Sequence, residues 1–225
     1  MRKLNHLLIL SLAFLITGCA LRQQTDKYVY QYSTSEILNR NNRTAGITRR
    51  ELRRRGKFGY GMLSGDSTVI VFNQDNEFRI DSDGTVTDPV YDSKFTYARV
   101  SKFNPDKTFD TIQPRNQSEF IRHFERTLSP QDAFYGLRIT GRFDSITVTS
   151  RLFNDSVERT RRDITGQLIG FRLPPLTQNT TQPRYRFVFV NRSSDWGGVV
   201  RHFNFNEGEI AVDRIYNYRL SLPQN

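Results

Sequence analysis

The chain has 225 residues, of which 12% are aromatic and 25% are charged, and its formal net charge is +10. This length suits one substantial domain or two small ones, and the composition excludes an intrinsically disordered chain. Because Cys19 is the only cysteine, an intramolecular disulfide is excluded. The sequence also lacks a phosphate-binding loop, a nucleophile elbow and an internal repeat.

The N-terminus has the pattern of an export signal. Arg2 and Lys3 precede an apolar run from Leu7 to Ile16, which is too short to span a bilayer. The run ends in Ile-Thr-Gly-Cys, which resembles the cleavage signal of bacterial lipoproteins. We therefore predict a signal peptide over residues 1–18 and lipidation of Cys19. An ordinary secretory signal with a chance cysteine is the alternative.

The mature protein is predicted to begin with a lipidated tether, residues 19–27, followed by one domain, residues 28–225. Ala20 follows Cys19, and the absence of Asp there resembles Gram-negative lipoproteins of the outer membrane. The positive net charge would hold the protein close to anionic lipid. We thus expect a membrane partner in the bacterial cell envelope and no nucleic-acid partner.

Two short helices are predicted near the start of the domain, after a strand at Tyr28–Tyr32. Ser33 and Glu36 form the pattern of a capping box, and Thr48 begins a second helix that ends at Gly56. Leu52 should point inward on this second helix, which carries Arg49, Arg50, Arg53, Arg54 and Arg55. This run fits either a solvated helix face or a basic patch that faces lipid headgroups or an acidic polymer.

Strands and one longer helix should follow. Asp83-Gly84 is a hairpin turn signal, and Ser118 is expected to cap a helix with a buried stripe of Phe120, Phe124 and Leu128. His123 lies on the other side of that helix. The strands are expected at Thr68–Phe72, Glu77–Ile80, Thr85–Thr87, Ala98–Phe103, Phe134–Phe143 with a turn, Ile146–Thr149 and Ile210–Leu222.

The stretch PRYRFVFVNRSSDWGGVVRHF, residues 183–203, predicts two strands on either side of a Gly-Gly turn. Residues two apart share a strand face, so Arg186 and Val188 should point the same way. On the second strand, one face should carry Val199, Arg201 and Phe203, with His202 opposite.

From YQYS at Tyr30 to LSLP at Leu220, the order and spacing of these segments resemble the alpha-acetolactate decarboxylase family. Close matches include FYGLRITGRF and GQLIGFRLP. The resemblance implies an α+β fold with two β-sheets, few helices and a cleft between the sheets. It also implies an enzyme that converts 2-acetolactate to acetoin and CO₂, with a zinc ion held by a His-x-His pair and a third His.

In this chain the matching metal-ligand positions are Arg186, Val188 and Val199, and none of these side chains can bind zinc. An acidic residue of the family matches Thr68, within one residue. The catalytic arginine matches Arg138, whereas Arg172 is given a structural role. A carboxylate that the family carries in a further C-terminal tail has no counterpart here.

These replacements suggest a site without metal, in which Arg138 and Arg186 face each other across the cleft and bind a carboxylate or phosphate. Alternatively, Arg186 turns outward or pairs with an acid such as Asp195 or Glu207, and Val188 and Val199 fill the pocket. Three functions stay open: a non-catalytic envelope lipoprotein that binds a small anion, an active zinc-dependent decarboxylase with a rebuilt site, and a purely structural protein.

Overall fold

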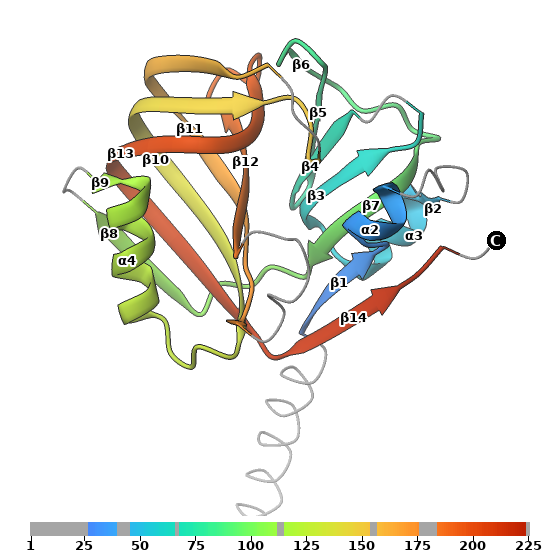
Figure 1. The fold of residues 1–225 in the computed structure, drawn as a ribbon, viewed down its shortest axis with the longest axis horizontal. Coiled ribbons are helices and arrows are strands. Elements are labelled where there is room, and N and C mark those ends of the chain that lie inside the picture. Colours follow the sequence, from blue (N-terminus) through green and yellow to red (C-terminus); the bar gives the residue numbers. More distant parts are fainter. Residues whose placement is uncertain are drawn as a thin grey trace, which may run out of the picture.

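A computed structural model describes residues 27–39, 46–65, 68–111, 115–153, 157–175 and 184–223. The described residues form two β-sheets and three helices, α2 (Ser35–Asn39), α3 (Arg49–Arg55) and α4 (Gln117–Thr127) (Figure 1). The predicted α+β class with two sheets and few helices is confirmed. None of these helices is long and apolar enough to cross a membrane. The predicted signal peptide, Cys19 and residues 20–26 of the tether lie outside the described ranges.

The first sheet has eight strands in the order β14-β1-β7-β3-β4-β5-β6, and β2 pairs with β7. Only the pairing of β1 with β14 is parallel. The bounds are β1 (Tyr28–Tyr32), β2 (Ile47–Thr48), β3 (Phe58–Leu63), β4 (Val69–Asn73), β5 (Asn76–Ile80), β6 (Val86–Thr87), β7 (Lys94–Ser101) and β14 (Asn217–Ser221). The predicted hairpin at Asp83-Gly84 is confirmed as the connection between β5 and β6.

The second sheet has six strands, and β10 pairs with both β11 and β13. The strands β10, β11, β12 and β13 therefore form a closed ring, which Figure 1 shows beside the first sheet with α4 on its outer side. The bounds are β8 (Lys107–Thr111), β9 (Arg115–Asn116), β10 (Phe134–Thr149), β11 (Arg159–Arg172), β12 (Tyr185–Asn191) and β13 (Gly197–Ile215). The two strands expected at Phe134–Phe143 and Ile146–Thr149 are one continuous strand.

Buried apolar side chains form three cores. The first fills the space between the sheets, and Phe171 of β11 meets Phe58 and Tyr60 of β3 there. The second lies on the other face of the second sheet, where Phe120 and Phe124 of α4 pack. The third covers the outer face of the first sheet and includes Leu52 of α3, as predicted. Burial of these surfaces is the main force that holds the sheets together.

The helix caps and the last strand differ in detail from the sequence expectations. The Thr34 hydroxyl, not Ser33, accepts a hydrogen bond from the first turn of α2, and Asn116, not Ser118, caps α4. The Thr48–Glu51 capping box of α3 is confirmed in full. The strand expected at Ile210–Leu222 is divided, because β13 ends in the second sheet and β14 joins the first.

Lys27 connects the predicted tether to the fold. Its Nζ donates to Asp213 at 2.7 Å, Asp106 at 3.1 Å and the Asn104 carbonyl at 3.0 Å. Burial raises the pKa of Asp213 to about 6, although the hydrogen bond from Lys27 opposes this shift. Burial also lowers the pKa of Lys27, but its bonds to the two carboxylates outweigh this and raise it. Lys27, which the sequence analysis assigned to the tether, is thus held by contacts with the domain.

Candidate functional site

One row of residues crosses four strands of the second sheet. Strand pairing places Arg138 of β10 beside Ile169 of β11, Ile169 beside Val188 of β12, and Val188 beside Val199 of β13. Ile169, Val188 and Val199 all belong to the core between the sheets, so this face of the sheet is turned toward the first sheet. The two strands expected within residues 183–203 are present as β12 and the start of β13. The predicted Gly-Gly turn is wrong, because Gly197 and Gly198 pair with β12 and the turn lies at residues 192–195.

Arg186 lies two residues before Val188 and shares its face, as the alternation predicted. Arg138 and Arg186 do not, however, face each other across a cleft. Both project from the same face of the same sheet, separated by β11. Each guanidinium covers a different ring: Arg138 lies 5.4 Å from the centre of Phe103, and Arg186 lies 4.9 Å from that of Phe153.

The two valines at the matching ligand positions fill the space between the sheets. Val188 is 0% exposed and Val199 is 4% exposed. Thr68 is buried at the start of β4, but Val69, the next residue, is the one that packs in the core between the sheets. Apolar side chains therefore occupy the positions at which the resemblance places metal ligands.

Arg186 is half-buried and points inward. Its Nη1 donates to the Leu152 carbonyl, and its other described neighbours include Phe153. Burial lowers the pKa of Arg186; the hydroxyls of Tyr60 and Tyr97 raise it, and the charge of Arg99 lowers it. Neither Asp195 nor Glu207, the acids considered above, is among the contacts of Arg186; Asp195 instead bonds Asn191.

Beside Arg186 lies a polar group of the first sheet. Arg99 of β7 is almost fully buried and donates to Gln31 Oε1 at 3.0 and 2.5 Å and to the Tyr60 hydroxyl at 3.2 Å. The Tyr97 hydroxyl is buried and has no hydrogen-bond partner among the described residues. Burial raises the pKa of Tyr97, which therefore stays a hydrogen-bond donor at all ordinary pH values.

The Phe153 ring links the two sides of this group. It meets the Tyr97 ring edge-on, with 4.9 Å between the centroids, and it lies under the Arg186 guanidinium at the same distance. A buried donor without a partner costs about 1–3 kcal/mol, because its hydration is lost and not replaced. An oxyanion between Arg186 and Tyr97 would recover that cost and would match the local positive charge.

The side chains at the site do not fit a zinc ion. An arginine and two valines offer no ligand atoms at the three matching positions. The described residues include no group of three or more His, Cys, Asp or Glu that could hold a metal ion. His123 and His202 are both exposed.

A β-bulge in β13 turns the side chains at the end of the 183–203 stretch to the opposite face of the sheet. The pairing of β10 with β13 shifts register between Thr147 and Val148, opposite Val200 to His202. Consequently Val199 packs between the sheets while Phe203 packs under α4. The expectation that Val199 and Phe203 share a face is wrong for this reason.

Arg172 is fully buried and holds the start of β10. Its Nη1 donates to the carbonyls of Gln131 at 2.5 Å and Ala133 at 3.0 Å, and its Nη2 pairs with Glu125 at 3.0 Å. Tyr185 donates to the same carboxylate at 2.6 Å. These contacts support the structural role that the sequence assigned to Arg172.

Sequence reasoning missed Arg99 and Tyr97. Arg99 lies within the strand predicted at Ala98–Phe103, and Tyr97 lies just before it, because β7 in fact runs from Lys94 to Ser101. Nothing local distinguishes the two residues from other strand residues. Only the packing of β7 against the second sheet brings them close to Arg186. In the sequence, Arg99 and Arg186 are 87 positions apart. The tyrosine-rich pattern of YVYQY and KFTYARVS is the one available signal.

Comparison with known proteins gives one consistent result. A profile of the alpha-acetolactate decarboxylase family matches residues 29–225. The alpha-acetolactate decarboxylase of Methylococcus capsulatus is 26% identical over 211 residues, which cover 88% of this chain and 81% of the relative. That of Methanosarcina mazei is 24% identical and covers 87% and 72%.

Solved structures share the fold. The alpha-acetolactate decarboxylase of Bacillus subtilis superimposes with a TM-score of 0.79 at 21% identity, over 88% of this chain and 90% of that one. A Staphylococcus aureus protein of unknown function, described as similar to alpha-acetolactate decarboxylase, has a TM-score of 0.78 at 20% identity, over 87% and 89%.

Proposed function

Because this chain belongs to the alpha-acetolactate decarboxylase family, we propose that it is a member that has lost the metal-dependent reaction and binds a small carboxylate between its two sheets. The decarboxylation needs a strong electrophile where negative charge develops. The ligand positions that would hold it are Arg186, Val188 and Val199. Loss of one member of a catalytic group already costs orders of magnitude in rate, and here three are replaced.

The observation that carries the binding proposal is the buried Tyr97 hydroxyl, which has no described hydrogen-bond partner beside the inward-pointing Arg186. A carboxylate would accept one bond from the hydroxyl and a charge-assisted bond from the guanidinium. The buried Arg99 adds a second positive charge from the opposite sheet. Arg138, the retained family position, lies on the same face but next to Phe103, so its role is to add positive charge at the edge.

The proposal also covers location. The Ile-Thr-Gly-Cys sequence supports lipidation at Cys19 and a place in the bacterial cell envelope, at the outer membrane in a Gram-negative host. Labelling with a radioactive or alkyne-bearing fatty acid should mark the wild type and not Cys19→Ser. Equal labelling of both would refute the anchor without touching the binding proposal.

The enzymatic half is tested by acetoin release from 2-acetolactate with added zinc or manganese, together with metal analysis of the protein. We expect no turnover above the uncatalysed rate and no stoichiometric metal. Metal-dependent turnover would instead support an active decarboxylase with a rebuilt site. The binding half is tested separately, by thermal unfolding with acetate, lactate or pyruvate.

A ligand at 100 times its Kd stabilises the folded state by about 2.7 kcal/mol, which raises the Tm of a protein this size by roughly 5–10 °C. Tyr97→Phe should lose this shift and yet be no less stable without ligand, because it removes a hydroxyl that makes no bond. The matched control, Tyr185→Phe, should keep the shift and lose stability, because its hydroxyl donates to Glu125 at 2.6 Å. If Tyr97→Phe responds to the acids as the wild type does, the site is not the one described.

A further inference from the structure

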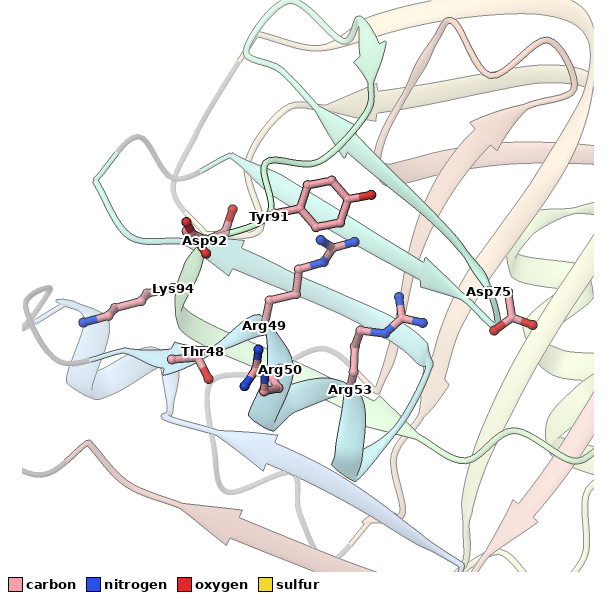
Figure 2. A pocket seen from close by; sticks show the side chains of 9 residues that line it. Thr48, Arg49, Arg50, Arg53, Asp75, Tyr91, Asp92 and Lys94 are labelled. Carbon is pink, nitrogen blue, oxygen red and sulfur yellow. The ribbon is translucent and has the colours of Figure 1, made fainter.

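A hollow lies on the outer side of the first sheet, away from the site proposed between the sheets. It has a volume of about 960 Å³ and is formed by α3, the loop before β7 and the turn between β4 and β5. Four basic residues and two acidic ones line it: Arg49, Arg50, Arg53, Lys94, Asp75 and Asp92. Figure 2 shows the guanidiniums of Arg49 and Arg53 side by side above α3, with Tyr91 and Asp75 at either end.

A single carboxylate holds two of these arginines. Glu77, whose side chain is only 3% exposed, pairs with Arg49 Nε at 2.6 Å and with Arg53 Nη1. Each guanidinium uses one described bond to this carboxylate, so further N–H groups are left for a ligand. Glu77 balances one of the two charges, and the pair therefore keeps a positive excess in a fixed orientation.

Of the remaining charges, Arg50 and Lys94 add to this excess and Asp92 offsets one of them. Arg50 and Lys94 are exposed, and neither is within ion-pair distance of a carboxylate among the residues that the structure describes. Asp75 is already paired with Lys57 at 3.0 Å, outside the hollow, and this partner lowers its pKa. The hollow is thus positively charged overall and suited to a phosphate group, which accepts bonds from several guanidiniums at once.

The rim of the hollow is apolar at one point. Val90 is 57% exposed and Tyr91, whose ring lies 4.8 Å from the Arg49 guanidinium, is 83% exposed. A large apolar pair beside basic residues is the arrangement by which proteins lie on a membrane, with aromatic and aliphatic side chains at the acyl boundary and cations at the headgroups. An acidic polymer would use the cations but would give the apolar pair no partner.

We propose that the hollow of α3 binds the phosphate headgroup of an anionic phospholipid while Val90 and Tyr91 enter the membrane interface. The face that carries α3 then lies on the bilayer, whichever way the N-terminus is attached. This surface is separate from the site between the sheets, and the two can be tested independently.

The test is co-sedimentation of the full chain with vesicles of phosphatidylglycerol and phosphatidylcholine, compared with vesicles of phosphatidylcholine alone. Any contribution of the N-terminal segment is common to all variants. A basic residue near an anionic surface contributes about fivefold in affinity, so Arg50→Gln/Lys94→Gln should bind the anionic vesicles roughly 25-fold more weakly. The control variant Arg126→Gln/Arg162→Gln removes two exposed charges elsewhere and should change binding by less than about threefold.

Two further comparisons identify the ligand. Val90→Ser/Tyr91→Ser should weaken vesicle binding several-fold and leave binding to the soluble polyanion heparin unchanged. Inorganic phosphate and glycerol phosphate at millimolar concentration should displace little protein from vesicles, since they lack the interface. If Arg50→Gln/Lys94→Gln and the control Arg126→Gln/Arg162→Gln lose equal affinity for the anionic vesicles, the proposal is wrong. Tight heparin binding without a preference for anionic vesicles would also overturn it, in favour of a polymer.

Discussion

At the level of single residues, the charge state of Asp213 should govern part of the stability of the fold. Its pKa is about 6 in the folded protein and close to 3.8 in the unfolded chain. The folded state therefore binds the proton more tightly, and the stabilisation from the protonated form is complete below pH 3.8 and lost as the pH rises through 6. Two pKa units correspond to about 3 kcal/mol.

We expect Asp213→Asn to remove this pH dependence, because an amide cannot ionise. Urea unfolding of both proteins at pH 4 and pH 7 measures it. The wild type should lose about 2 kcal/mol relative to the variant between these two pH values, somewhat less than the full shift because the unfolded carboxyl is already partly ionised at pH 4. A constant difference across the range would mean that the Lys27 ammonium fully compensates the burial of the carboxylate.

A second prediction concerns the three replaced ligand positions. Arg186→His/Val188→His/Val199→His puts two imidazoles on one strand face and a third directly opposite Val188. This is the arrangement that tetrahedral zinc needs, so the variant should bind one zinc ion and gain thermal stability from it. Isothermal titration calorimetry measures this against Arg186→His/Val188→His, which should bind more weakly. Without zinc, the triple variant should be less stable than the wild type, since two imidazoles enter an apolar core.

The alternation in the sequence was sufficient to place Arg186 and Val188 on one face of a strand and Val199 on the neighbouring strand. It failed beyond that residue because a bulge has no reliable local signal and moves the side chains that follow it, such as Phe203, to the other face. The sequence left open whether Arg186 points inward or outward, and it could not predict the partners of Arg186. Tyr97 and Arg99 meet it only through the packing of one sheet on the other, which no strand pattern encodes.

At the level of elements, Glu77 connects α3 to the first sheet, in addition to the buried Leu52. It lies on β5 and pairs with two arginines of the helix. Glu77→Gln should lower the free energy of unfolding by about 2 kcal/mol, since charge-assisted hydrogen bonds are lost while the arginines can still reach water. Asp75→Asn is the control, because both partners of the Asp75–Lys57 pair are exposed, and no measurable change is expected.

The Thr48–Glu51 capping box explains why this arginine-rich segment was predictable as a helix. Thr48 accepts from the Glu51 amide at 3.3 Å, and Glu51 accepts from the Thr48 amide at 3.1 Å. Thr48→Ala should cost about 1 kcal/mol. Urea unfolding measures this loss of stability, and Thr127→Ala, at the other end of a different helix, should cost less.

The α2 and α4 caps were misplaced because several Ser, Thr and Asn residues stand next to each other there.

At the level of the whole molecule, the core between the sheets should make them unfold together. Phe171 is fully buried there and contacts aromatic side chains of β3. Phe171→Ala should cost about 3–5 kcal/mol through lost burial and a cavity. Trp196 lies in the connection between β12 and β13, packs in the core under α4 and pairs with Thr85, next to β6 of the first sheet. We expect its fluorescence and the far-ultraviolet circular dichroism of the whole chain to show one shared transition. Separate transitions in the wild type would mean that the sheets are independent units.

The final strands show why the two-sheet arrangement could be predicted but its connection could not. The alternation from Ile210 to Leu222 reads as one strand, yet the chain passes from the second sheet to the first at Tyr216. No turn residue or other local pattern in the sequence marks the passage from one sheet to the other at Tyr216. The resemblance to a family predicted two sheets, whereas long-range contacts determine which strand belongs to which sheet.

The place where the tether meets the fold has a mechanical consequence. β1 begins directly after Lys27 and lies between β14, which runs parallel to it, and β7. A pull on the N-terminus along β1 therefore loads the hydrogen bonds on both its sides at the same moment, in shear, together with the Lys27–Asp213 pair. A protein attached by this end should yield to force by sudden rupture at a high threshold, and its outer strand should not peel away bond by bond.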